Sequence, residues 1–342
     1  MGKKIPERRS DDQADRELFK ATLPFSAESV TTSWWVVGST FLLLLASLFG
    51  AALAPVWPLR LLFSVLSALL MLRAFITYHD YLHKAILPRS RTARWLFRLY
   101  AVLALTPPGT WKRTHNYHHG HVGKIDAAST GAFAMMTTDM WRDASLAARI
   151  AYRVERHPLT ILAGYFTIFF LSVTLLPFLR NPARNWDSLV VMLGHAGLIA
   201  ALWILGGFAT AFFVLLLPMT IAAMIGSYLF FAQHSFENMQ ILSTETWTSR
   251  RAAIESSSYL KLNKIMRWFT GNIGYHHIHH LNVRIPFYRL PEAMDAIVEL
   301  QSPVTITLSL KDIRASFRCC LWDEGLQRMV SYREFARASA AA

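Results

Sequence analysis

Residues 59–83 read LRLLFSVLSALLMLRAFITYHDYLH, an apolar run that ends in two histidines, His79 and His83. A helix of roughly 20 apolar residues crosses the hydrocarbon core of a bilayer, so residues 59–78 predict a membrane span. Arg73 stands near the end of this run, where a long cationic side chain can reach the interface. Because the histidines follow at once, the stretch predicts imidazoles at one end of a membrane helix.

Histidine is concentrated in three short windows of this chain. Nine of the 13 histidines lie in HDYLH at 79–83, HNYHH at 115–119 and HHIHH at 276–280. Imidazole is the commonest side-chain metal ligand. Unrelated surface histidines on basic loops are the alternative, but that reading does not account for three clusters beside apolar segments. The windows therefore predict a metal site at a membrane face.

The composition is that of a membrane protein. Hydrophobic residues make up 53% of the chain and charged residues 17%, and the formal net charge is +13. The basic residues flank apolar segments and form no continuous stripe, which fits loops facing anionic lipid better than nucleic-acid binding. The two cysteines, Cys319 and Cys320, are adjacent. They exclude a disulfide framework and a thiolate zinc cluster.

One apolar segment must fail to cross if all three histidine windows share one site, and basic residues indicate which one. We expect four spans at about 36–56, 59–78, 189–205 and 208–232. The segment 158–179 has arginines on both flanks, at 149, 153, 156, 180 and 184. Since basic residues mark cytoplasmic loops, both of its ends are expected in the cytoplasm, which predicts a re-entrant or interfacial hairpin. All three histidine windows then share the cytoplasmic side.

The same pattern predicts the domain organisation. Residues 1–33 form a polar cytoplasmic tail, 34–300 the membrane domain, and 301–342 a cytoplasmic C-terminal tail. Within the membrane domain, YLKLNKIMRWFT at 259–270 predicts an amphipathic helix, with its apolar side toward membrane or core. The predicted fold class is an all-α integral membrane protein with four transmembrane helices, re-entrant or interfacial helices and a cytoplasmic helical cap.

The spacing inside the windows is that of a helix face. Positions i, i+3 and i+4 share one side of a helix, and this spacing selects eight imidazoles, those of His79, His83, His115, His118, His119, His276, His279 and His280. Eight imidazoles are too many for one metal and suit two ions in one pocket. Nitrogen ligands at two redox-active centres indicate iron. No catalytic residue is separable from these ligands.

Five histidines lie outside this pattern. His234, in AQHSFEN after the last predicted span, is expected at the depth of the windows and is taken as a further ligand. His277 offers a competing register and is assigned a supporting or surface role. The other three receive structural roles: His121 off the helix face, His157 as a cap or interface residue, and His195 as a helix-packing partner.

These motifs resemble those of the membrane fatty acid desaturases, most closely the acyl-lipid (delta-12 and omega-3) branch. The likeness rests on HDYLH, HNYHH, AQHSFEN and GNIGYHHIHHLNVRIPFYRLP at 271–291. It implies a four-span fold, two Fe²⁺ ions held by the eight window histidines and His234, and O2 as co-substrate. HDYLH lacks the small residues common in the first motif of plant relatives, so neither substrate nor double-bond position is carried over.

The predicted function is therefore a di-iron fatty acid (acyl-lipid) desaturase of the bacterial inner membrane, with its active site on the cytoplasmic side. No His-Pro-Gly-Gly haem motif is present, so electrons are expected from a separate ferredoxin- or flavoprotein-type donor. The expected partners are a fatty acyl lipid and membrane lipids, without nucleic acid. Two alternatives stay open: a related di-iron hydroxylase or ketolase acting on a lipid or carotenoid, and a non-catalytic metal-binding membrane protein.

Overall fold

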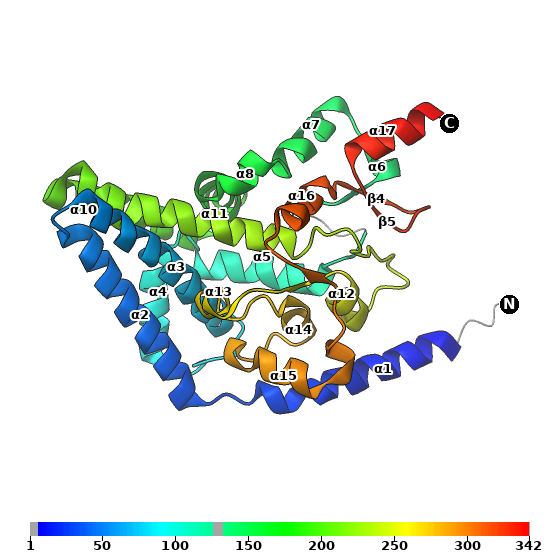
Figure 1. Ribbon diagram of the computed structural model, residues 1–342, viewed down its shortest axis with the longest axis horizontal. Helices are drawn as coiled ribbons and strands as arrows, with labels where there is room; N and C mark the ends of the chain where they lie inside the picture. Colours follow the sequence, from blue (N-terminus) through cyan, green and yellow to red (C-terminus); the bar gives the residue numbers. More distant parts are fainter. Residues whose placement is uncertain (1–5, 126–132, 342) are drawn as a thin grey trace.

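The computed structural model describes residues 6–125 and 133–341 and is mainly helical (Figure 1). Its centre is an antiparallel pair of long apolar helices, α2 (Val30–Leu53) and α3 (Trp57–Leu82), joined by a three-residue turn that contains Pro55. Ser29 begins α2 because its hydroxyl accepts a hydrogen bond from the Thr32 N–H. α11 (Leu217–Ala232) packs along α3. These three helices supply 12 of the 23 buried residues of one apolar cluster.

The third apolar stretch runs from Trp186 to Ala232 and contains a break. α10 (Trp186–Ala211) contains Gly207 at φ 75° and ψ 175°, a conformation essentially restricted to glycine. The π-helical turn η3 (Phe212–Leu216) then leads into α11. Among the described residues, three stretches are long and apolar enough to cross a membrane: Val30–Leu53, Trp57–Leu82 and the 47 residues of Trp186–Ala232.

The segment predicted as a hairpin at 158–179 is almost continuously helical. It consists of α8 (Pro158–Leu162), the π-helix η2 (Tyr165–Leu175) and α9 (Leu176–Arg180). The linking residue Gly164 keeps right-handed helical angles, so the backbone bends without reversing. The segment is apolar and rich in threonine and phenylalanine, and its backbone N–H and C=O groups form hydrogen bonds within its own helical turns. The expected hairpin is therefore wrong.

Shorter helices surround this centre. On the side that carries the histidines lie α4 (Arg91–Leu103), α5 (Pro108–His121), α12 (Ser249–Glu255), α13 (Lys264–Phe269), α14 (His276–Leu281), η4 (Phe287–Arg289), α15 (Leu290–Ala296) and η5 (Val298–Leu300). Toward the C-terminus the chain adds α16 (Leu310–Arg318) and α17 (Tyr332–Ala341), which lies near α6 (Thr138–Asp143) and α7 (Leu146–Glu155) (Figure 1).

The described chain is mostly helical, as predicted, and it contains five short strands in addition. A three-stranded sheet has the order β1-β4-β5, and a parallel pair joins β2 to β3. The strands are β1 (Met136–Thr137), β2 (Tyr259–Leu260), β3 (Thr305–Ile306), β4 (Leu321–Asp323) and β5 (Arg328–Val330). They are two or three residues long, too short for an alternating pattern in the sequence.

Three predicted segments contain structure that the sequence pattern did not specify. The polar N-terminal region contains helices α1 (Pro6–Thr22) and η1 (Leu23–Ser26). Residues beyond 300 belong to the folded body, since Trp322 is buried in one cluster with Phe231 of α11. The amphipathic helix expected at 259–270 is confined to α13, because Tyr259 and Lys261 donate backbone hydrogen bonds to Val304 and Ile306. Long-range pairing overrides the local periodicity there.

Candidate metal centre

The first histidine window closes the long helix α3. His79 lies in its last turn, and His83 caps it, with its N–H bonded to the His79 carbonyl at 3.0 Å. The next residue, Lys84, has φ 61°, which ends the helix. Both imidazoles are buried and project from consecutive turns of one helix face.

The second window lies on α5, whose start is fixed by another helix. Pro108 stands in the first turn, where its missing N–H costs nothing. The Asp187 carboxylate of α10 accepts hydrogen bonds from the N–H groups of Gly109 at 2.7 Å and Thr110 at 3.1 Å. A carboxylate at a helix N-terminus satisfies free donors and complements the helix dipole. α10 therefore orients the helix that carries His115, His118 and His119.

The third window and the lone histidine come from two further elements. HHIHH forms α14, in which every histidine is buried. His234 follows directly after the end of α11 and is also buried. The ends of α3 and α11 and the helices α5 and α14 thus surround one interior region.

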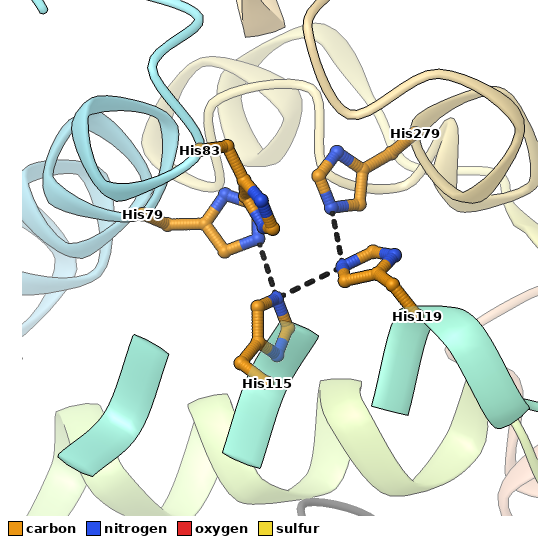
Figure 2. A group of neighbouring side chains, drawn as sticks. All are labelled: His79, His83, His115, His119 and His279. Atoms are coloured by element: carbon orange, nitrogen blue, oxygen red, sulfur yellow. Dashed lines mark hydrogen bonds between the residues drawn. The ribbon is translucent and has the colours of Figure 1, made fainter. Parts of the chain in front are cut away.

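The nine predicted imidazoles form two groups, and in each group the ligand atoms lie within 4.8 Å of one another. Figure 2 shows the first group, His79, His83, His115, His119 and His279. The second group comprises His118, His234, His276 and His280. In the second and third windows, the i and i+4 imidazoles enter one group while the i+3 imidazole enters the other.

Distances within each group match those expected around one metal ion. In the first group, the His115 Nε2 lies 3.0 Å from the Nε2 atoms of both His79 and His119. In the second, the His234 Nε2 lies 3.2 Å from that of His118 and 2.9 Å from that of His276. Imidazole binds such ions at about 2.0–2.1 Å, which puts two ligands at right angles about 3 Å apart.

A buried, unpartnered atom also fits a metal. The Nε2 of His83 is buried and has no hydrogen-bond partner among the described residues, although unpaired buried polar atoms are costly. His83 belongs to the first metal-ligand group. Imidazole nitrogen suits iron, zinc, copper and nickel. The residues present therefore fit a pair of transition-metal ions.

The protonation states suit metal binding as well. Burial lowers the pKa of His234 to about 4. Burial, and then the neighbouring imidazole of His234, hold the pKa of His118 well below its usual value. The same two causes, burial and adjacent imidazoles, lower the pKa of His119 and His280. A metal ligand must be neutral imidazole, and these groups are neutral at physiological pH.

Two acceptors orient the imidazoles from behind. The His79 Nδ1 lies 3.0 Å from an Asp80 carboxylate oxygen, and the other oxygen accepts the Phe287 N–H at 2.7 Å. The His234 Nδ1 lies 3.0 Å from the Ser256 carbonyl oxygen. Each acceptor favours a proton on Nδ1 and leaves Nε2 free to bind metal. The histidine spacing gave no reason to single out Asp80, although a carboxylate beside a predicted span is itself a functional signal.

Aromatic side chains separate the histidines from polar surroundings. The Trp111 ring stacks on His115 at 4.1 Å between centroids. Phe230, in the last turns of α11, lies 5.2 Å from the His118 ring and 6.5 Å from that of His115. Apolar ring surfaces therefore lie against both metal-ligand groups.

The other four histidines lie outside both groups. His121 bonds to the Tyr117 carbonyl on its own helix, and the His157 ring accepts the Leu159 N–H at the start of α8. His195 joins Tyr165 and the Val102 carbonyl between helices. These placements agree with the predicted roles. His277 is buried rather than on the surface, with its Nε2 3.2 Å from the Leu300 carbonyl oxygen.

The fold and the site define a helical protein in which two all-histidine metal-ligand groups meet at the ends of apolar helices. Residues 55–306 match the family described as fatty acid desaturase. A fatty acid desaturase of Bacillus subtilis (strain 168) is 33% identical over 279 residues, which cover 80% of this chain and 78% of that protein. The chain therefore belongs to the fatty acid desaturase family.

Two cyanobacterial relatives are more distant. An sn-1 acyl-lipid omega-3 desaturase (ferredoxin) of Nostoc sp. (strain 36) is 25% identical, covering 65% of this chain and 63% of its own length. An sn-1 oleoyl-lipid 12-desaturase of Synechocystis sp. (strain ATCC 27184 / PCC 6803 / Kazusa) is 24% identical, covering 67% and 66%. The resemblance to the acyl-lipid branch of the family is confirmed.

Proposed function

We propose that this protein is an oxygen-dependent, di-iron desaturase that introduces a cis double bond into a fatty acyl chain of a membrane lipid. The observation that carries the proposal is the division of nine buried imidazoles into two adjacent groups, in a chain of the desaturase family. A zinc pair would fit the nitrogen ligands equally well but has no redox chemistry.

In this proposal both groups are ligand sets. The first ion is held by His79, His83, His115, His119 and His279, and the second by His118, His234, His276 and His280. When bound, the pair supplies the reduction of O2 that makes an unactivated C–H bond breakable. Asp80 and the Ser256 carbonyl hold two of the imidazoles in the tautomer that exposes Nε2. Trp111 and Phe230 keep the surroundings apolar.

Four membrane spans are proposed: α2, α3, α10 and the η3–α11 limb. A helix of 47 residues would extend about 70 Å, more than twice the hydrocarbon core, and it is broken at Gly207. Its beginning, at Asp187, contacts α5, while its end precedes His234. Both of its ends are thus near the histidines, which supports two crossings joined by a turn at Gly207.

The segment 158–180 is proposed to lie at the interface without crossing. Arg156, before it, donates a hydrogen bond to the Oγ of Ser235, next to His234. Asn185, after it, accepts a hydrogen bond from Arg113 of α5. Both ends are therefore held beside elements of the metal centre. Arginines on both sides favour the cytoplasmic face, which we infer to be that of the inner membrane of a bacterium.

The substrate and the electron donor are inferred from the names of the relatives and from the net charge of this chain. The names of two relatives specify acyl-lipid or oleoyl-lipid substrates, and one specifies ferredoxin. We assign this chain an acyl chain esterified to a lipid, with electrons from a separate ferredoxin- or flavoprotein-type protein. The net charge of +13 suits an acidic partner.

Expression in a bacterial host that makes only saturated and monounsaturated fatty acids tests the function. Gas chromatography with mass spectrometry should find a new double bond in the lipids of cells producing the wild-type chain. His118→Ala should abolish it, and His121→Ala, outside both groups, should not. A hydroxylated product would show that the protein is a hydroxylase and not a desaturase. No new product from any supplied chain length, with two irons bound, would refute a lipid-oxidising role.

A further inference from the structure

A second apolar site lies away from the histidines, between α2, α3 and α13. It is a partly open cavity of about 300 Å³, the lower end of the range for small-molecule sites, about 300–1,000 Å³. Its walls come from three segments: Leu43 and Ala46 of α2, Phe63 and Leu70 of α3, and Trp268 and Phe269 of α13.

The walls of this cavity are almost entirely apolar. Ser47 is the one hydroxyl-bearing residue that lines it, and its Oγ donates to the Leu44 carbonyl at 2.9 Å and pairs with Ser67 Oγ at 2.8 Å. Its hydrogen bonds are therefore made inside the helix pair. An occupant of the cavity must be apolar, since a polar group would lose its hydrogen bonds there.

A buried cation holds one wall in place. The Arg73 side chain of α3 donates to the Trp268 carbonyl and to Thr40 Oγ1, and its guanidinium lies 4.1 Å from the centroid of the Trp268 ring. No carboxylate among the described residues forms an ion pair with it. Arg73 therefore fixes α13 against α3, with the Trp268 ring along the cavity.

The outer surface of α13 has the character of a membrane interface. Ile265 is 69% exposed and Trp268 is 40% exposed. Lys261 and Lys264 are exposed beside them, and neither forms an ion pair with a carboxylate in the described parts of the chain. Exposed apolar and aromatic residues flanked by lysines are typical of segments that lie on anionic lipid.

We propose that this cavity binds one acyl chain of an anionic phospholipid of the surrounding bilayer, with its headgroup near Lys261 and Lys264. A methylene group is close in volume to a water molecule, about 30 Å³, so the cavity holds about ten methylenes, much of one acyl chain. The walls are lipid-facing surfaces of α2 and α3, so a phospholipid can reach them by lateral diffusion in the bilayer. This site does not depend on the reaction at the metals.

The lipid would also support the metal centre mechanically. α13 leads through Gly271, at φ 51°, and Asn272, at φ 54°, toward α14. A Cβ on Gly271 would stand 2.8 Å from Ile76 of α3, so this turn is packed tightly against the helix that carries His79. Lipid that stabilises α13 therefore stabilises the turn that precedes His276.

Native mass spectrometry of the delipidated full-length protein in mild detergent tests the site. Dioleoyl phosphatidylglycerol is the probe, and dioleoyl phosphatidylcholine is the neutral comparison. Ala46→Phe fills the cavity from an exposed helix position and should weaken binding of one phosphatidylglycerol at least ten-fold. Leu45→Phe is the matched control, since Leu45 is 52% exposed on the same helix and does not line the cavity. It should bind as the wild type does.

A second pair of measurements tests the headgroup. Lys261→Gln with Lys264→Gln should remove the preference for phosphatidylglycerol over phosphatidylcholine while leaving the cavity intact. Equal lipid binding by Ala46→Phe and Leu45→Phe proteins, both monodisperse, would overturn the site, and an unchanged preference in the lysine variant would overturn the headgroup assignment. Neither readout uses turnover, so failure here leaves the desaturase proposal standing, and the reverse also holds.

Discussion

The Nε2 atoms of His118 and His234 lie 3.2 Å apart, although the two residues are 116 positions apart in the chain. His234 is not part of any histidine window, yet it completes the second ligand group with His276 and His280. The end of α11 is therefore as much a part of the site as the three windows. A histidine that follows a membrane helix here has the environment of a metal ligand.

Replacement of His234 should remove one of the two metal ions. In His234→Ala the second group keeps three imidazoles and the first group keeps all five. The metal content measured by plasma mass spectrometry should fall from about two ions per chain toward one, and activity should be lost. His195→Ala, which alters a buried histidine between helices, should retain both ions. Full metal content in His234→Ala would remove this residue from the ligand set.

Asp80 should matter for metal affinity rather than as a ligand. One Asp80 oxygen accepts the His79 Nδ1–H and the other accepts the Phe287 N–H. Asp80→Asn replaces one of these two acceptor oxygens with an NH2 donor. Loss of such a partner of a ligand typically weakens metal binding about 10–100-fold. Competition with a chelator measures the change. Asp139→Asn, in an exposed ion pair with Arg142, is the control, and equal affinities in the two variants would contradict the orienting role.

Asp187 should stabilise α5 from outside that helix. Asp187→Ala removes the acceptor of the Gly109 and Thr110 N–H groups, and lost caps cost about 0.5–2 kcal/mol. Thermal unfolding in detergent should show the loss. Asp143→Ala, on the exposed end of α6, should leave the melting temperature nearly unchanged. Matching melting temperatures for the two variants would show that α5 does not need this cap.

Gly207 should be intolerant of a side chain. Its φ of 75° and ψ of 175° cost a residue with a Cβ about 1–3 kcal/mol. Gly207→Ala should therefore lower thermal stability, although nothing lies within 4 Å of the added Cβ. Gly197→Ala, equally uncrowded within α10, should be neutral or stabilising. The same effect at both positions would mean that the turn is not strained.

The metal-free protein should lose stability on acidification. Burial lowers the pKa of His277 and of His234 to about 4 in the folded state, against an ordinary value of about 6.5. As pH falls below 6.5, the unfolded chain binds protons that the folded chain does not. Each such histidine then lowers the free energy of unfolding by about 1.4 kcal/mol per pH unit, until pH approaches 4.

Thermal unfolding of chelator-treated protein between pH 7.5 and pH 5 measures this slope. His277→Gln removes one titrating group outside the two ligand groups and should make the slope shallower. A melting temperature that stays constant over this range would contradict the burial of neutral imidazoles.

Local sequence determined the apolar helices and the candidate imidazoles. In lipid, an unbroken apolar run can pair its backbone N–H and C=O groups only by forming a helix. The i, i+3, i+4 spacing places three imidazoles on one face of whichever helix carries them. The spacing on α5 and α14 is therefore realised directly. The expected pair of metals also followed, because eight aligned imidazoles exceed the coordination of one ion.

Only the tertiary structure decided which imidazoles share a group. His279 joins His79 rather than His276 because α14 crosses beside the end of α3, and no local pattern records how two helices are placed. The contact between Asp80 and the Phe287 N–H, and the pairings of β1 with β4 and of β2 with β3, are equally non-local. Sequence periodicity encodes which face a residue occupies, whereas the partner opposite that face depends on how the whole chain packs.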